Sequence, residues 1–113
     1  MDGLIIKKYW IDKIFLNNTI EIRSSNTKKT GRFALIESGS GCIVGDAYIT
    51  HTIKIRDEEH FNNLRHIHNI PGKMEKLNYK NVWGWILHSI YKYPKPIPYT
   101  HPMGAVIWVK DVL

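Results

Sequence analysis

The stretch Thr19-Ile-Glu-Ile-Arg23 decides the predicted fold, because it is short and alternates strictly between polar and apolar residues. Its two isoleucines share one face, and its threonine, glutamate and arginine share the other, which is typical of a half-buried β-strand. Side chains two residues apart on one face lie roughly 7 Å from each other. Glu21 and Arg23 can therefore share a ligand, with the guanidinium offering a fork of donors. The alternative is an exposed salt bridge on a solvated face, where such pairs contribute little.

The segments on either side of this strand predict a mostly antiparallel sheet with two helices. An apolar stripe formed by Ile11, Ile14 and Phe15 has helical spacing. Gly45, inside a long alternating segment, indicates a bulge or a close backbone approach. Strands are expected over residues 4–7, 19–23, 32–37, 42–55, 82–91 and 104–109, and helices over 9–16 and from 57 to about 70, with an extended proline-rich run over 93–98.

This order of elements excludes one common architecture. The strands are not regularly interleaved with helices, which argues against a doubly wound parallel sheet. The predicted fold class is α+β, a small and mostly antiparallel barrel or curled sheet with about five or six strands and two or so helices. The polar residues 73–81 fit no element, and no linker or repeat divides residues 1–113, so a single domain is expected.

Composition indicates in which cellular compartment the protein is expected and what class of partner it is expected to bind. The chain has 43% hydrophobic residues, which supports a folded protein, and no apolar run approaches the roughly 20 residues that cross a bilayer. Cys42 is the only cysteine and no secretory signal is visible, so a cytoplasmic location without membrane attachment is expected. The formal net charge of +6 favours a polyanionic partner such as RNA, although it also serves plain solubility.

Several segments taken together resemble the ASCH domain, a member of the PUA-like β-barrel group. The resemblance covers nearly the whole chain, from about Leu4 to Lys110. Similar domains are associated with RNA binding, and some are enzymes that hydrolyse the acetyl amide of N4-acetylcytidine or act as ribonucleases. The matching segments are Ile6-Lys7 with the helix that follows, Thr19–Arg23, Ser38-Gly39-Ser40-Gly41-Cys42-Ile43-Val44-Gly45, the proline-rich run, and the closing segment His101–Trp108.

The chain departs from the amidohydrolase pattern at two positions. In that type a lysine and a threonine on the core strand act with a distant glutamate. Here Asn17 and Asn18 stand where the lysine is expected, and Glu21 replaces a hydroxyl two residues beyond Thr19. An asparagine cannot deprotonate a nucleophile, and a carboxylate is an unusual group to attack an amide. The resemblance therefore does not carry this activity to the chain.

The resemblance implies a cleft between the first helix, the central strand and the glycine-rich turn. Lys7 and Arg23 can hold a phosphate or a base edge there, while Glu21 accepts from an exocyclic amine or fixes the guanidinium. Trp10 is the first choice for stacking on a base. Main-chain N–H groups of the turn can surround an anion, although turn chemistry also explains its glycines. The candidate ligand-binding residues are Lys7, Trp10, Thr19, Glu21, Arg23, Ser38, Gly39, Ser40 and Gly41.

Catalysis and metal binding have fewer candidates. Thr19, Glu21 and His101 are the candidate catalytic residues, although Pro102 after the histidine favours a turn. The His66-x-His68 pair does not match a zinc site, so no metal and no cofactor is expected. The sequence predicts a domain that binds RNA or a modified nucleoside in a basic cleft. The alternatives are a small hydrolase or ribonuclease acting on RNA or an acylated nucleoside, and a protein-interaction adaptor.

Overall fold

In the computed structural model, which describes all 113 residues, one curled six-stranded sheet carries the helices. The strand order is β2-β5-β4-β3-β1-β6, and every pair is antiparallel except β1 with β3. The strands are β1 (Gly3–Ile6), β2 (Ile20–Arg23), β3 (Gly31–Glu37), β4 (Cys42–Ile55), β5 (Val82–Pro98) and β6 (Trp108–Val109). The helices are α1 (Lys8–Leu16), α2 (Glu58–Asn63), α3 (Arg65–His68) and the 3-10 helix η1 (Met74–Leu77). None of them is long and apolar enough to span a bilayer.

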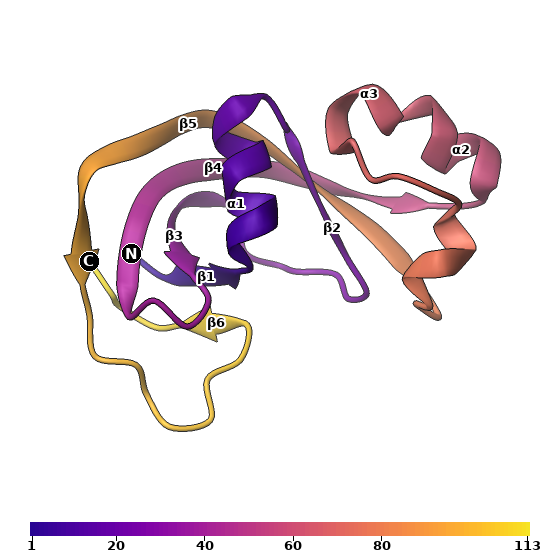
Figure 1. The fold of residues 1–113 in the computed structure, drawn as a ribbon. Helices are drawn as coiled ribbons and strands as arrows, with labels where there is room; N and C mark the ends of the chain where they lie inside the picture. The colour runs from indigo at the N-terminus through magenta and orange to yellow at the C-terminus, as the bar shows by residue number, and fades with distance from the viewer.

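The predicted α+β fold class is confirmed, and of the two predicted forms, a barrel or a curled sheet, the structure has the curled sheet. Figure 1 shows β4 and β5 bending together along the length of the molecule. The sheet curls but does not close, because β2 and β6 lie at opposite ends of the strand order and do not pair. The expected extension of the proline-rich run is also confirmed, since β5 continues through it to Pro98.

Gly45 allows the sheet to bend. The pairing register of β4 with β5 shifts between Ile43 and Gly45. A Cβ atom on Gly45 would lie 2.3 Å from the main-chain oxygen of Tyr91 and 2.8 Å from the ring of Phe15, so only glycine fits. Both the expected bulge and the expected close approach are therefore present at this position.

Helix α1 fills the inside of the curled sheet. Ile11 and Ile14 are 1% and 2% exposed, which confirms the apolar stripe predicted for this helix. They pack with Trp85 and with residues of β1, β3 and β4 in the largest core cluster. This packing fixes the start of α1, and with it Lys7 and Trp10, beside the inner face of the sheet.

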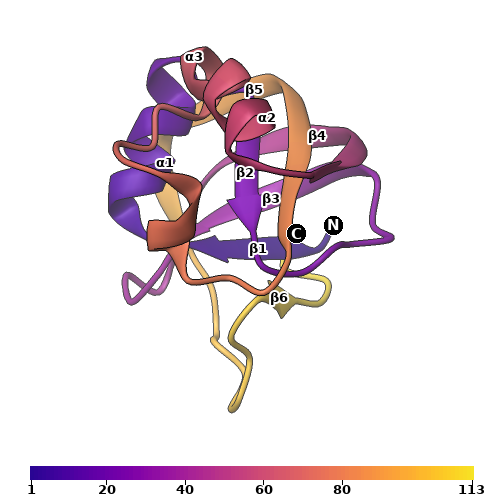
Figure 2. The same ribbon diagram turned by 90° about the vertical axis from the view of Figure 1, so that its right-hand side faces the viewer.

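Both faces of β2 are covered, which argues against the alternative of an exposed salt bridge on a solvated face. In the β2–β5 register Glu21 lies opposite Trp85, which belongs to the main core. Ile22, on the other face, packs on a cluster that contains Phe61 of α2. Figure 2 shows β2 with α2 and α3 in front of its upper end and α1 beside it. Residues far along the chain cover the strand, so Glu21 and Arg23 face the interior of the molecule and not bulk water.

The segment between β4 and β5 differs from the single helix expected from residue 57 to about 70. Leu64, with φ −96° and ψ 0°, leaves the helical conformation and separates α2 from α3. The expected cap is present, because Asp57 accepts the N–H of His60 at 2.8 Å. After α3, Asn69 adopts a left-handed conformation and turns the chain back.

Glu58 ties the next turn of this segment to α2. Its two carboxylate oxygens accept the N–H groups of Met74 and Glu75 at 2.9 and 3.0 Å, which anchors η1 in the region the sequence left unassigned.

The last strand is shorter than predicted. Only Trp108 and Val109 are in β6, and the expected strand over 104–109 was wrong. Gly104 has a positive φ of 83°, and Ala105 donates to the main-chain oxygen of Pro102 at 3.3 Å, so a turn occupies the first half of that segment.

Candidate ligand-binding cavity

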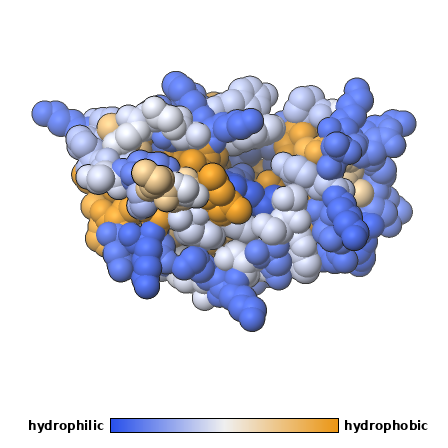
Figure 3. Space-filling model, turned by 90° about the horizontal axis from the view of Figure 1, so that it is seen from below, coloured by the Kyte–Doolittle hydropathy of each residue, from blue (hydrophilic) through white to orange (hydrophobic).

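A cavity of about 270 Å³ lies along the edge of β2 that faces away from β5. One side is formed by the end of β1 and the start of α1, with Lys7 and Trp10. The other side is formed by α3 and the segment around η1, with His68 and Tyr79. Seen from below, the molecule has a central hollow bordered by hydrophobic surface, with hydrophilic residues around it (Figure 3).

An ion pair between Arg23 and Glu21 forms the polar wall of the cavity. Both Nε and Nη2 of Arg23 lie 3.0 Å from Oε2 of Glu21. Nη2 also donates to the main-chain oxygen of Ile5 at 2.8 Å, and the guanidinium lies 5.6 Å from the centre of the Trp85 ring. Arg23 is therefore held by three different groups and bridges the gap between β2 and β1.

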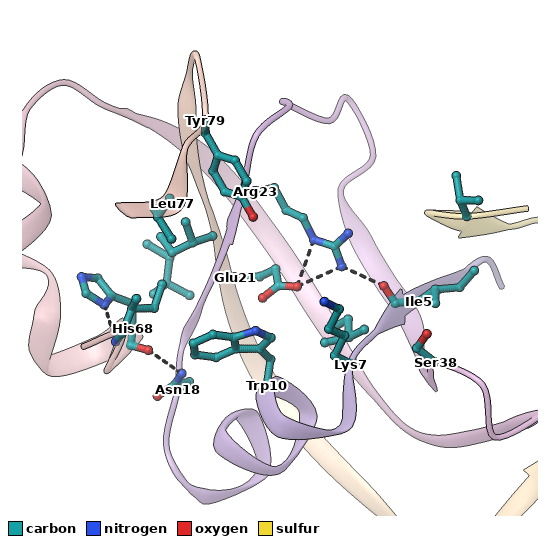
Figure 4. A pocket seen from close by; sticks show the side chains of 15 residues that line it. Ile5, Lys7, Trp10, Asn18, Glu21, Arg23, Ser38, His68, Leu77 and Tyr79 are labelled. Atoms are coloured by element: carbon teal, nitrogen blue, oxygen red, sulfur yellow. Dashed lines mark hydrogen bonds and ion pairs between the residues drawn. The ribbon is translucent and has the colours of Figure 1, made fainter. Parts of the chain in front are cut away.

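The same pair keeps hydrogen-bonding capacity for a ligand. Glu21 is only 7% exposed, and its second oxygen, Oε1, has no hydrogen-bond partner in the protein. Nη1 of Arg23 is likewise free of protein partners. In Figure 4 the pair lies among Lys7, Trp10 and Tyr79. The cavity thus offers one carboxylate acceptor beside guanidinium donors.

Burial changes the protonation of the carboxyl group. Desolvation raises the pKa of Glu21 above its ordinary value, and the charge and hydrogen bonds of Arg23 oppose part of that rise. A carboxyl group with a perturbed pKa that lines a cavity is a pointer to function, although structural ion pairs are perturbed in the same way.

Lys7 and two aromatic residues complete the mouth of the cavity. Lys7 is the residue before α1, is exposed, and takes part in none of the four salt bridges. Trp10 is half-buried, and its ring meets that of Tyr9 edge to face at 4.6 Å. Tyr79 is 42% exposed on the opposite side. The mouth therefore combines an uncompensated positive charge with two flat apolar surfaces.

Asn18 fastens the far wall to the start of β2. Its Nδ2 donates to the main-chain oxygen of His68 at 2.8 Å, and its Oδ1 accepts from Nδ2 of Asn69 at 2.6 Å. Asn18 is 4% exposed, so its bond to His68 is shielded from water, whereas the bond to the exposed Asn69 is partly open to solvent. The side chain that stands in place of the lysine of the amidohydrolase pattern is thus structural here.

His68 stabilises the same wall from within. Its Nδ1 accepts the N–H of Ile70 at 2.8 Å, and Nε2 lies 2.9 Å from the main-chain oxygen of Phe61. This arrangement requires the neutral ring with its proton on Nε2. Burial lowers the pKa of His68, which keeps the ring neutral.

The cavity brings together five of the candidate ligand-binding residues. They are Lys7, Trp10, Glu21, Arg23 and Ser38. Their assignment to a ligand stays a prediction, but the expected hollow between the carboxylate and the neighbouring cations is present.

The other candidates lie elsewhere. Thr19 precedes β2 and is exposed outside the cavity. Gly39, Ser40 and Gly41 form the tight turn between β3 and β4, where the Ser40 hydroxyl donates to the main-chain oxygen of Glu37 at 2.7 Å. Turn chemistry therefore accounts for most of this motif.

His101 is also outside the cavity. Its Nδ1 lies 2.8 Å from the Tyr99 hydroxyl and its Nε2 lies 2.9 Å from the main-chain oxygen of Ala105. Both nitrogens brace the loop before β6, in agreement with the turn that Pro102 suggested.

Sequence reasoning missed the wall contributed by residues 68–79. His68, Ile70, Leu77 and Tyr79 line the cavity but come from a helix end and from residues without a predicted element. The residues after Asn69 mix polar and apolar side chains without a regular period. This pattern does not indicate that the segment contacts the start of β2, some 50 residues earlier in the chain, as in the bond from Asn18 to His68.

Comparison with known proteins finds similarity in structure and none in sequence. No family model and no curated protein matches the sequence. A crystal structure of ASCH from Zymomonas mobilis superimposes with a TM-score of 0.66 at 12% identity, covering 86% of this chain and 72% of that one. The chain has the fold of an ASCH domain. Two variants of the same bacterial ASCH protein, one tyrosine-to-phenylalanine and one serine-to-alanine, each give a TM-score of 0.63 at 14% identity. They cover 86% of this chain and 74% and 72% of their own. In this ASCH-like fold the cavity lies where the expected cleft was, between α1 and β2.

Proposed function

We propose that the ASCH-like domain binds a nucleoside, either free or as part of an RNA strand, in the cavity beside β2. The observation that carries this proposal is a largely buried ion pair whose unused atoms, Glu21 Oε1 and Arg23 Nη1, belong to residues that line the cavity. A nucleobase has donors and acceptors close together on its edge, and such a pair can satisfy both kinds.

The size and walls of the cavity favour a ligand no larger than a nucleoside. Its volume of about 270 Å³ is just below the roughly 300–1,000 Å³ range of pockets for small molecules. Trp10 and Tyr79 present aromatic rings from opposite sides, and stacking on an aromatic ring contributes about 1–3 kcal/mol per base.

Positive charge around the mouth favours a phosphorylated ligand. Lys7 has no acidic partner, and the same holds for Lys73, Lys76 and Lys80, which lie in or next to η1. The whole chain carries a formal charge of +6. RNA therefore satisfies more of the exposed charges than a neutral nucleoside does, because each phosphate that is bound releases counterions.

The test is a titration with a short single-stranded RNA at 50 and 200 mM salt. Contact with about four phosphates gives a log–log slope near −3, which is a loss of affinity of roughly 50-fold over this fourfold change in salt. Tyr79→Ala should weaken binding, whereas Tyr91→Ala, at a tyrosine that is also exposed but lies outside the cavity, should not. Lys7→Ala should reduce the slope by about 0.7, and Lys110→Ala serves as its control. Absence of RNA and nucleoside binding at both salt concentrations would refute the proposal.

A second candidate is hydrolysis of RNA or of an acylated nucleoside. The buried carboxyl of Glu21, with its raised pKa, is suited to exchange a proton with water or a leaving group. The two other candidate catalytic residues, Thr19 and His101, lie outside the cavity, so Glu21 would have to act on a water molecule. Incubation with labelled RNA and acylated cytidine separates the candidates: turnover that is lost in Glu21→Gln supports the enzyme, and binding without turnover supports the binding domain.

A further inference from the structure

The strand β2 has an edge that pairs with no other strand, and the cavity runs along it. The N–H of Leu87 donates to the main-chain oxygen of Thr19 at 2.8 Å, so Thr19 is among the residues that bond to β5. In an antiparallel pair, residues that bond to the partner alternate with residues whose N–H and C=O point the other way. The main-chain groups of Ile20 and Ile22 therefore point away from β5, toward the side of the cavity.

Nothing else in the protein uses these groups. The only strand that pairs with β2 is β5, and no loop or side chain donates to or accepts from the main chain of Ile20 or Ile22. Both residues line the cavity, and Ile20 is only 2% exposed. A buried main-chain group without a partner costs about as much free energy as a lost hydrogen bond. A ligand with complementary groups would recover that free energy.

We infer that the free edge of β2 recognises the ligand through its main chain, and that the ligand is a planar heterocycle with a donor beside an acceptor on its rim. An extended residue presents its N–H and C=O on the same edge, which is how two antiparallel residues exchange two hydrogen bonds. Nucleobases present donors next to acceptors in the same way, as uracil does with its ring N–H between two carbonyls. The inference rests on the proposed function, and it adds which part of the base the main chain of β2 recognises, namely the adjacent donor and acceptor on its rim.

A peptide that adds to β2 as a further strand is the other ligand with this pattern. The free edge favours the heterocycle over the peptide. The two residues whose main-chain groups point to the cavity, Ile20 and Ile22, span only about 7 Å of strand. On one side, the bond from Asn18 to His68 brings α3 against the start of the strand. On the other, Arg23 bridges to Ile5 of β1. A chain of several residues cannot lie along an edge that is blocked at both ends.

The decisive variant is Ile22→Pro, which removes one N–H from the free edge. Proline is tolerated in an edge strand where the N–H points away from the ladder, so the pairing with β5 is retained. Ile22→Val is the matched control, because it trims the side chain and keeps the N–H. The probes are uridine and N3-methyluridine, whose methyl group removes the ring donor. We expect Ile22→Pro to weaken uridine binding by about 5- to 100-fold and Ile22→Val by no more than roughly twofold. Wild-type protein should bind N3-methyluridine more weakly than uridine by a factor similar to that of Ile22→Pro.

Three results would overturn the inference. Equal uridine affinity of Ile22→Pro and Ile22→Val would leave the proposed function standing and exclude main-chain recognition. Equal affinity of wild type for uridine and its N3-methyl form would do the same. Binding of acetyl-dialanine amide by a protein that binds no nucleoside would reject the inference and the proposed function together. If circular dichroism shows that Ile22→Pro does not fold, the α-hydroxy acid analogue of isoleucine at position 22 replaces the same N–H by oxygen and decides by the same comparison.

Discussion

Removal of the Asn18 side chain should release the wall of the cavity that is formed by α3 and η1. The carboxamide donates to the main-chain oxygen of His68 and accepts from Asn69, at 2.8 and 2.6 Å. In Asn18→Ala both bonds are lost, and the oxygen of His68 stays buried without a partner, because no other group in the protein donates to it. Loss of a buried hydrogen bond that leaves one group unsatisfied costs about 1–3 kcal/mol. With the second, partly exposed bond, a total near 2–3 kcal/mol is expected.

The assay is urea unfolding of Asn18→Ala beside Asn17→Ala. Asn17 is the adjacent asparagine, but it is exposed and its side chain makes no hydrogen bond, so its substitution should change stability by less than about 0.5 kcal/mol. Thermal unfolding should show a decrease in the melting temperature of roughly 4 °C or more for each kcal/mol. If Asn18→Ala is no less stable than Asn17→Ala, the contact between α3 and the start of β2 does not hold the wall as described.

Two further predictions concern stability. His68 should make the protein sensitive to mild acid: its pKa is lowered in the folded state, so the unfolded chain takes up the proton first, and stability is lost as the pH falls below about 6.5. His68→Gln should remove this part of the pH dependence of the free energy of unfolding, and an unaltered profile for this variant would contradict the assignment. Gly45→Ala should destabilise the fold by about 1–3 kcal/mol or more, because its Cβ would lie 2.3 Å from the oxygen of Tyr91 and the curled strands would have to separate. Gly39→Ala is an informative comparison, since a Cβ there meets no atom within 4 Å and only its positive φ opposes the change.

Elements governed by local patterns could be predicted from the sequence. The long alternating segment gives β4 with the bounds Cys42–Ile55, as expected, and the apolar stripe gives α1 within one residue of its start. The break at Leu64 could not be predicted, because the residues before and after it have the spacing of one helix. The shortness of β6 was missed for a similar reason, since the apolar run near the C-terminus is interrupted by a turn at Gly104.

The two walls of the cavity were not equally predictable. Lys7, Trp10, Glu21 and Arg23 were expected in one cleft because of the resemblance to the ASCH domain, and the structure brings all four to the cavity. Tyr79 and His68 reach the cavity only through contacts between residues far apart in the chain, such as the one between Asn18 and His68. Local periodicity contains no information on such contacts, so the sequence predicted a cleft between the first helix, the strand and the turn and missed the wall from residues 68–79.

The candidate site exists because the sheet does not close. β2 and β1 come near each other at one end of the curl but form no ladder, and the bond from Arg23 to the oxygen of Ile5 spans the gap. A buried ion pair is a costly way to join two strands, since well-packed apolar side chains of similar volume are often as stable or more stable. Unlike an apolar contact between the two strands, the ion pair leaves hydrogen-bonding atoms free beside an unpaired strand edge. At Arg23 stability and binding are therefore inseparable, whereas Lys7 and Tyr79 are exposed at the mouth of the cavity, so the loss of binding there can be measured without loss of the fold.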